Sequence, residues 1–168
     1  GIRHILSQVQ SEKPDIVIAL LHWGSEYDSS VSKTQEEIRD LMLQGGVDVI
    51  LGTHSHLVGP LEMTTAQGET MLTAYSLGNL LSTGEESEDS QGLVLKLEFT
   101  KKGDQTELTG YHYDPIYLAG NGRTGVGAFE ILKIRDEISL YESQYVGRVS
   151  QEVYEALKQS LEQVEVSV

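Results

Sequence analysis

The first half of the chain alternates between amphipathic helical patterns and short apolar runs. Apolar residues recur at the spacing of one helix face over residues 2–12, which predicts an amphipathic helix. The run IVIALL (16–21) is rich in β-branched side chains and is typical of a strand buried on both faces. Thr34 and Glu37 fit a capping box for a second helix, and VDVILG (47–52) predicts another buried strand. This order, with short connections, predicts a right-handed parallel crossover.

The second half has a different pattern, in which apolar and polar residues alternate between turns. Lys96 and Glu98, for example, alternate with apolar neighbours, as in a strand with one face in water. We therefore expect an α/β fold in which parallel strands with helices are followed by antiparallel or mixed strands and a C-terminal helix. The predicted strands are 70–78, 92–100, 105–118 and 127–138, and the predicted terminal helix is 150–166.

Both predicted parallel strands end in histidine. His22 follows the first strand in LLHWG, and His54 and His56 follow the second in LGTHSH. Ligands of open α/β sheets gather at the carboxyl ends of the strands, and adjacent strands lie about 5 Å apart. If residues 54–56 are extended, both of their imidazoles face the crevice and Ser55 turns aside. The three histidines are then a set that suits a divalent metal ion.

The alternative is that these histidines only form hydrogen bonds within loops, as a single histidine after a strand usually does. A second strand-terminal histidine beside the His-x-His pair favours metal binding. His4 and His112 have no such neighbours in the sequence, and we interpret both as structural. Gly52 and Gly59 flank the pair and would let the backbone bend and approach a ligand.

Other polar residues near the histidines have several interpretations. Glu26 fits a metal ligand, a residue that orients an imidazole, a general base or a solvated loop acid. Trp23, the only tryptophan, fits core packing or a pocket wall. Asn79 would position a substrate oxygen or support a turn, and the second role is favoured. Asp28 and Asp48 are interpreted as loop and strand-entry residues.

Composition narrows the classes of partner. The 168 residues include 26 acidic and 12 basic residues, for a formal charge of −14, which argues against nucleic acid and anionic membrane surfaces as partners. The absence of cysteine excludes disulfide scaffolds and zinc–thiolate sites. No apolar run reaches the length of about 18 residues that spans a membrane, and no signal peptide is visible. The chain starts in a helical pattern, so we expect the later part of a longer protein.

Three motifs together resemble a known family. HWGSEY (22–27), QGGVDVILGTHSHLVGPLE (44–62) and YSLGNLLS (75–82) are similar, in order and spacing, to motifs of the bacterial capsule-synthesis family (CapA or PgsA-like) linked to poly-γ-glutamate. The resemblance covers residues 1–120. More distantly, it implies the calcineurin-like metallophosphatase fold, a two-sheet α/β sandwich with metal ions at the strand ends.

The resemblance also implies roles for individual residues. His22 matches a histidine that binds one metal ion, and His54 and His56 match a pair that serves one or two ions. Glu26 and Asn79 match the family's glutamate and asparagine, the latter without an assigned task.

This sequence departs from the family pattern at three points. Serine replaces the usual proline at residue 55, and leucine replaces the usual phenylalanine at residue 80. More seriously, no motif upstream of His22 supplies the remaining ligands of a two-metal site. We therefore expect residues 1–168 to be a single domain that forms the C-terminal portion of a longer member. Its sheet edge would be covered by another chain or by domain swapping.

Two functions stay open. The first is a metal-dependent hydrolase-like protein of capsule or poly-γ-glutamate biosynthesis, in which one or two zinc, manganese or iron ions activate water and His22 and Glu26 are catalytic. The second is a non-enzymatic accessory domain for polymer synthesis or export at the cell surface. Expected partners are an anionic polymer or phosphoester, other capsule-synthesis proteins and a second copy of the chain. The family implies that the full-length protein is extracytoplasmic and membrane-associated, with this chain itself soluble.

Overall fold

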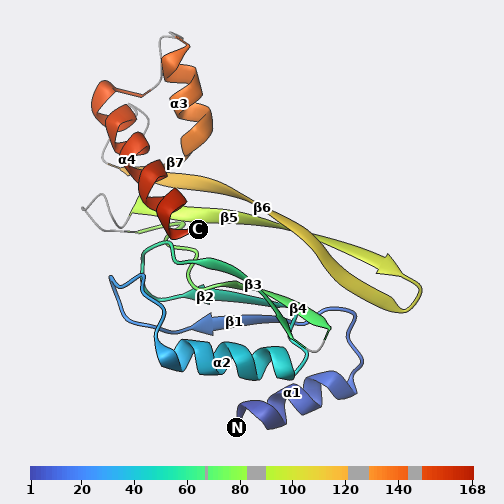
Figure 1. Cartoon of the computed structure of the whole chain (residues 1–168). Helices are drawn as coiled ribbons and strands as arrows, with labels where there is room; N and C mark the ends of the chain where they lie inside the picture. The colour runs from blue at the N-terminus through green and yellow to red at the C-terminus, as the bar shows by residue number, and fades with distance from the viewer. Residues whose placement is uncertain (67, 83–89, 121–128, 144–148) are drawn as a thin grey trace.

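The described residues form two β-sheets and four helices (Figure 1). The computed structural model describes residues 1–66, 68–82, 90–120, 129–143 and 149–168. The helices are α1 (Ile2–Ser11), α2 (Lys33–Gln44), α3 (Ile134–Glu142) and α4 (Gln151–Ser167). The strands are β1 (Ile18–His22), β2 (Val49–Thr53), β3 (Leu61–Ala66), β4 (Glu69–Ala74), β5 (Gln91–Lys102), β6 (Gln105–Gly120) and β7 (Phe129–Lys133).

The first sheet has four strands in the order β1-β2-β4-β3. β2 pairs in parallel with both β1 and β4, and β3 closes the sheet in antiparallel pairing with β4. Helices α1 and α2 lie on one side of this sheet and the β5–β6 hairpin lies on the other (Figure 1). The predicted parallel crossover, β1-α2-β2, is therefore confirmed, as is the mixed α/β class. The arrangement is compatible with the sandwich that the resemblance implies.

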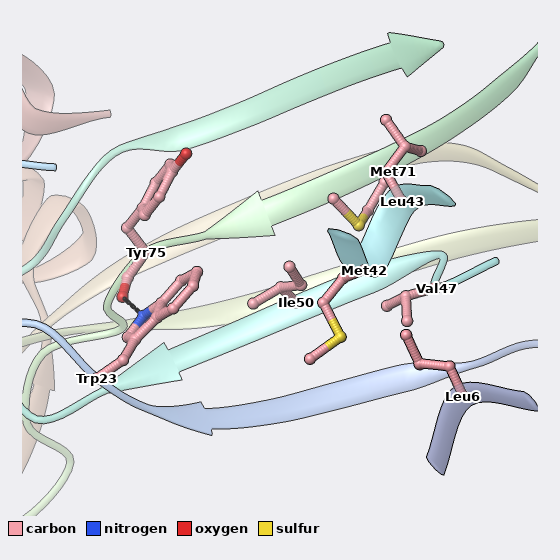
Figure 2. Packing of buried hydrophobic residues seen from close by; sticks show 8 residues of the cluster. All are labelled: Leu6, Trp23, Met42, Leu43, Val47, Ile50, Met71 and Tyr75. Carbon is pink, nitrogen blue, oxygen red and sulfur yellow. Dashed lines mark hydrogen bonds between the residues drawn. The ribbon is translucent and has the colours of Figure 1, made fainter. Parts of the chain in front are cut away.

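A hydrophobic cluster joins the two helices to the four-stranded sheet (Figure 2). Ile50 and Met71 project from the sheet, are fully buried, and meet Met42 and Leu43 of α2. Full burial of each such side chain contributes about 1.5–3 kcal/mol to the stability of the folded state. At one end of the cluster, Trp23 extends the apolar packing to the point where β1 ends. The core thus reaches the strand ends that carry the histidines.

The second sheet has the order β5-β6-β7 and is antiparallel throughout. Helices α3 and α4 pack on it through fully or nearly fully buried residues of a separate cluster, among them Tyr117, Leu132 and Leu157. A smaller cluster, formed by Val58, Leu93 and Val164, lies where the loop after β2 meets β5 and α4.

The structure corrects several expectations. β1 is an edge strand rather than one buried on both faces: exposure alternates along it, and Leu20 is 77% exposed because its side chain projects from the face that is not packed against the helices. The capping box of α2 is formed by Ser32 and Gln35 rather than by Thr34 and Glu37, since the Ser32 side chain accepts the backbone N–H of Gln35.

Three segments also differ from the predicted elements. The predicted strand 70–78 ends at Ala74 and is parallel to β2, and β3 was not predicted. The predicted strand 127–138 divides into β7 and the first turn of α3, with residues 127–128 outside the described residues.

Candidate functional site

The site is built at the carboxyl ends of β1 and β2. These strands run in parallel with His22 in register with Thr53, so their last residues lie side by side. His54 directly follows β2, and its ring centroid lies 4.4 Å from that of His22, with the ring planes inclined by 44°. The predicted meeting of strand-end histidines from two neighbouring strands is thus present for this pair.

Residues 54–56 are not extended, contrary to expectation. The φ angles of His54 and His56 are 108° and 62°, in the region that residues with a Cβ rarely adopt. Each such conformation costs about 1–3 kcal/mol and persists only where the surroundings hold it in place. The alternation argument for their common direction was therefore wrong. Instead, the bend sends His54 to His22 and His56 to the loop that follows β1.

His56 lies among Glu26, Tyr27 and Asn79. Its Nδ1 is 3.1 Å from Asn79 Oδ1, and its Nε2 is 3.9 Å from Glu26 Oε1. The Tyr27 ring lies 5.5 Å away, and the Tyr27 backbone N–H donates to the Ser55 carbonyl at 2.8 Å. This backbone bond fixes the 22–27 loop against the 54–56 bend, which brings Glu26 to His56.

Hydrogen bonding defines which nitrogen of His56 carries a proton. The Asn79 amide oxygen can only accept, so His56 Nδ1 must donate to it. In neutral imidazole this leaves a lone pair on Nε2. A Glu26 carboxylate oxygen then lies 3.9 Å from this second acceptor, and a cation, a proton or a donating water molecule between the two would stabilise the arrangement. Asn79 therefore has a side-chain contact with the site in addition to its place in a turn.

Trp23 has the packing role that was one of its two interpretations. It is buried, stacks on Tyr75 at 5.6 Å between centroids, and donates Nε1–H to the Tyr75 carbonyl at 2.8 Å (Figure 2). Gly52 is required by this contact. A Cβ on Gly52 would lie 2.0 Å from the Tyr75 carbonyl oxygen. At Gly59 the nearest atom would be the Ser76 nitrogen at 3.0 Å.

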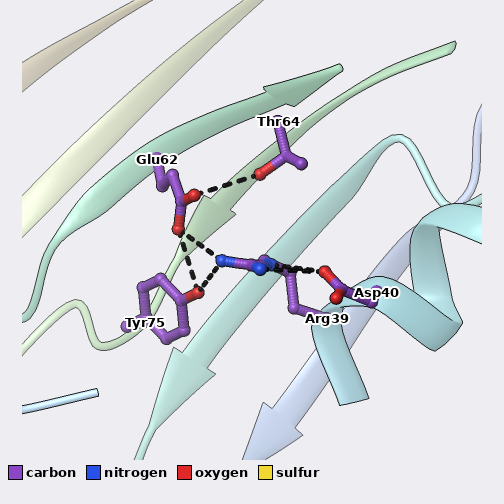
Figure 3. A network of polar contacts seen from close by, with 5 residues as sticks. All are labelled: Arg39, Asp40, Glu62, Thr64 and Tyr75. Atoms are coloured by element: carbon purple, nitrogen blue, oxygen red, sulfur yellow. Dashed lines mark hydrogen bonds and ion pairs between the residues drawn. The ribbon is translucent and has the colours of Figure 1, made fainter. Parts of the chain in front are cut away.

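A polar network that the sequence did not predict holds the other side of Tyr75 (Figure 3). Arg39 of α2 donates Nη1–H to Glu62 Oε2 at 2.8 Å and to the Tyr75 hydroxyl oxygen at 2.9 Å. The Tyr75 hydroxyl in turn donates to Glu62, and Asp40 accepts from the remaining guanidinium nitrogens. Burial, together with the Glu62 hydrogen bond, raises the pKa of Tyr75 to about 12. The network ties α2, β3 and the end of β4 together beneath the site.

Three of the residues that we interpreted as structural have polar side-chain contacts, which lie away from the histidine cluster. Asp28 accepts the backbone N–H of Ser30, and Asp48 accepts that of Val17 at the start of the β1–β2 region. His112 lies on β6, 3.5 Å from Glu98 on the neighbouring strand, and His4 lies within α1. Ser55 is buried, and its hydroxyl donates to the Leu57 carbonyl.

The donor types fit a divalent cation, but the described residues do not form a complete set of ligands. Imidazole nitrogens with a carboxylate suit zinc, manganese or iron. Within residues 1–66, 68–82, 90–120, 129–143 and 149–168, however, no three histidine, aspartate or glutamate side chains are arranged to hold a metal ion. The histidines instead form one pair, His22 with His54, and one cluster, His56 with Glu26 and Asn79.

Comparison with known proteins agrees with these motifs. Residues 2–84, which include every residue of the candidate site, match the sequence model of the bacterial capsule synthesis protein family PGA_cap. Residues 2–84 therefore belong to the bacterial capsule synthesis protein family. The chain is 36% identical over 67 residues to the PGA biosynthesis protein CapA of Bacillus subtilis (strain 168). It is 37% identical over 67 residues to the capsule biosynthesis protein CapA of Bacillus anthracis.

Each match covers 40% of this chain, but only 17% of the Bacillus subtilis protein and 15% of the Bacillus anthracis protein. Among the helices in the described part of the chain, none is both long and apolar enough to cross a membrane.

Proposed function

We propose that this chain contributes ligands to a divalent-cation site in a hydrolase-like protein of capsule or poly-γ-glutamate biosynthesis. The observation that carries the proposal is the group of histidines at the ends of two parallel strands, where His56 has its Nδ1 proton committed to Asn79. His22, His54 and His56 would hold one or two zinc, manganese or iron ions. The strained backbone at the latter two supports a functional constraint on their positions.

The chemistry follows from these groups. The bound ion would polarise a phosphoryl or carbonyl oxygen and lower the pKa of a water molecule. Glu26 lies on the Nε2 side of His56 and would accept the proton of the attacking water. His22, at the exposed end of β1, would contact the substrate side of the ion. Trp23 would keep His22 in place through its stack on Tyr75.

The names of the relatives support the biological setting, since they describe proteins of PGA and capsule biosynthesis. An anionic polymer would be repelled by a chain of charge −14 unless cations lay between the two, which also favours a cation site. Other capsule-synthesis proteins are further expected partners, and the full-length protein would work outside the cytoplasm at the membrane. The exposed β1 edge, with Leu20 77% exposed, suits pairing with a second copy or with another chain.

A non-enzymatic accessory domain for polymer synthesis or export is the second candidate. It is favoured by one observation, the lack of three suitably arranged ligands within the described residues. In that case His22, His54 and His56 would bind a cation or polymer without turning it over. The two candidates make opposite predictions for hydrolysis.

The test is to measure metal content and hydrolysis of phosphodiester and γ-glutamyl amide substrates for the wild type, His56→Ala and the control His4→Ala. The proposal predicts that His56→Ala loses both metal and turnover, and that His4→Ala keeps both. Metal binding without turnover of any substrate would favour the accessory domain. Unchanged metal content and rate in His56→Ala would refute the proposed site.

A further inference from the structure

Thr53 is the last residue of β2 and has two polar contacts at the site. Its side-chain oxygen lies 3.2 Å from His22 Nδ1 and 3.3 Å from the backbone carbonyl oxygen of Leu21. Both contacts come from β1, because Thr53 is in register with His22 across the parallel pair. The sequence analysis did not identify Thr53, since a threonine at the end of a strand is also what β propensity favours.

The two contacts can both be hydrogen bonds in only one arrangement. A hydroxyl has one proton, and the Leu21 carbonyl can only accept, so the Thr53 proton goes to Leu21. Toward His22 the hydroxyl then offers a lone pair, and His22 Nδ1 must be the donor. Neutral His22 therefore has its proton on Nδ1 and its lone pair on Nε2.

We propose that Thr53 is a positioning residue, which selects the Nδ1–H tautomer of His22 and so presents Nε2 as the acceptor or ligand nitrogen. Asn79 selects the same tautomer of His56 by an independent contact. His22 at the end of β1 and His56 in the loop after β2 thus have the same nitrogen committed to the protein and the same nitrogen left for chemistry. Ligand histidines of metal sites are oriented in this way by partners of their other ring nitrogen.

The tautomer can be measured without any metal. We would label the histidines with ¹⁵N and record long-range ¹H–¹⁵N spectra at about pH 8.5, roughly two units above the ordinary histidine pKa of about 6.5. Protonated and unprotonated ring nitrogens have well-separated ¹⁵N shifts, and free histidine prefers the Nε2–H form. We expect His22 and His56 to be mainly Nδ1–H, and His4 and His112 serve as internal references.

Two substitutions of Thr53 test the role of its hydroxyl group. Thr53→Val keeps the shape and the strand propensity but removes the hydroxyl, so the His22 signals should revert toward the Nε2–H form. His56 should keep its signals, because Asn79 still holds it, and Thr53→Ser should restore the wild-type spectrum of His22. A merely structural role for Thr53 would not move the tautomer of one histidine selectively. A mainly Nε2–H His22 in the wild type, or a Thr53→Val spectrum equal to that of the wild type, would overturn the inference.

A zinc titration of the same proteins separates this inference from the proposed function. Only the consequence of the inference for cation binding rests on that function. We expect Thr53→Val to weaken zinc binding about 10–100-fold relative to Thr53→Ser. If the wild type binds no zinc, the proposed cation site fails, whereas the NMR spectra still decide the role of Thr53. If Thr53→Val changes the tautomer but leaves zinc affinity unchanged, the tautomer selection is supported, but its consequence for cation binding is refuted, because Nε2 of His22 is then not a ligand.

Discussion

Replacing Gly52 by alanine tests whether the carboxyl end of β2 is held against Tyr75 and Trp23. The added Cβ would lie 2.0 Å from the Tyr75 carbonyl oxygen and 2.5 Å from Trp23 Nε1. Since Cβ contacts shorter than 3.0 Å essentially never occur, the two backbone segments would have to separate by about 1 Å. Backbone atoms cannot rotate away as a flexible side chain can, so the whole strand end must move.

The cost follows from the contacts that this movement breaks. Overpacking of a core position costs about 1–3 kcal/mol. The separation also stretches two hydrogen bonds, Trp23 Nε1 to the Tyr75 carbonyl at 2.8 Å and Leu77 N to the Gly52 carbonyl at 3.1 Å. Each contributes roughly 1 kcal/mol. We therefore expect Gly52→Ala to lower the free energy of unfolding by about 2–5 kcal/mol.

The assay is urea denaturation followed by the fluorescence of Trp23, the only tryptophan in the chain. With a urea dependence of about 2 kcal/mol per molar, the midpoint should fall by roughly 1–2.5 M. Gly110→Ala is the matched control, since the nearest atom to its added Cβ is a Glu98 side-chain oxygen at an ordinary 3.4 Å. Equal midpoints for the two variants would refute the close approach at Gly52.

Three further predictions concern the elements beneath the site. Ser32→Ala should lower the free energy of unfolding by about 0.5–2 kcal/mol by thermal denaturation, whereas Thr34→Ala should change it little, because Ser32 is the N-cap of α2. Unfolded tyrosine ionises near pH 10 and folded Tyr75 near pH 12, so the wild type should lose up to about 2–3 kcal/mol of stability between these values. Urea denaturation at several alkaline pH values should show this loss in the wild type but not in Tyr75→Phe. An equal loss in both proteins would contradict the prediction. Arg39→Met should lower the free energy of unfolding by about 1–3 kcal/mol. A double-mutant cycle with Glu62→Gln should give a coupling energy of about 0.5–2 kcal/mol, and additive effects of the two substitutions would count against the network.

The sequence predicted the elements with strong periodicity and the region of the site. The amphipathic helices, the parallel crossover and the histidines at the strand ends follow from apolar patterns and from a general rule about strand ends. The edge position of β1 was not predicted because an apolar run does not indicate which strands lie beside it. Ile18 and Leu20 are 45% and 77% exposed, although their composition is that of a buried strand.

The parts that were missed depend on contacts between distant residues. The sequence around Arg39 does not indicate that its partners are Glu62 and Tyr75, which lie 23 and 36 residues away. The capping box was assigned two residues late because both Ser32 and Thr34 precede a suitable side chain three positions on. The bend at His54 and His56 was missed because positive φ at histidine is rare and has no sequence signal.

The central claim is that the strand-end histidines hold a cation. The most direct measurement is elemental analysis of protein purified without chelator, for the wild type, His54→Ala and the control His112→Ala. The account predicts about one or two equivalents of a divalent transition metal in the wild type and in His112→Ala, and a loss in His54→Ala. Absence of metal from all three proteins, or equal content in His54→Ala, would contradict it.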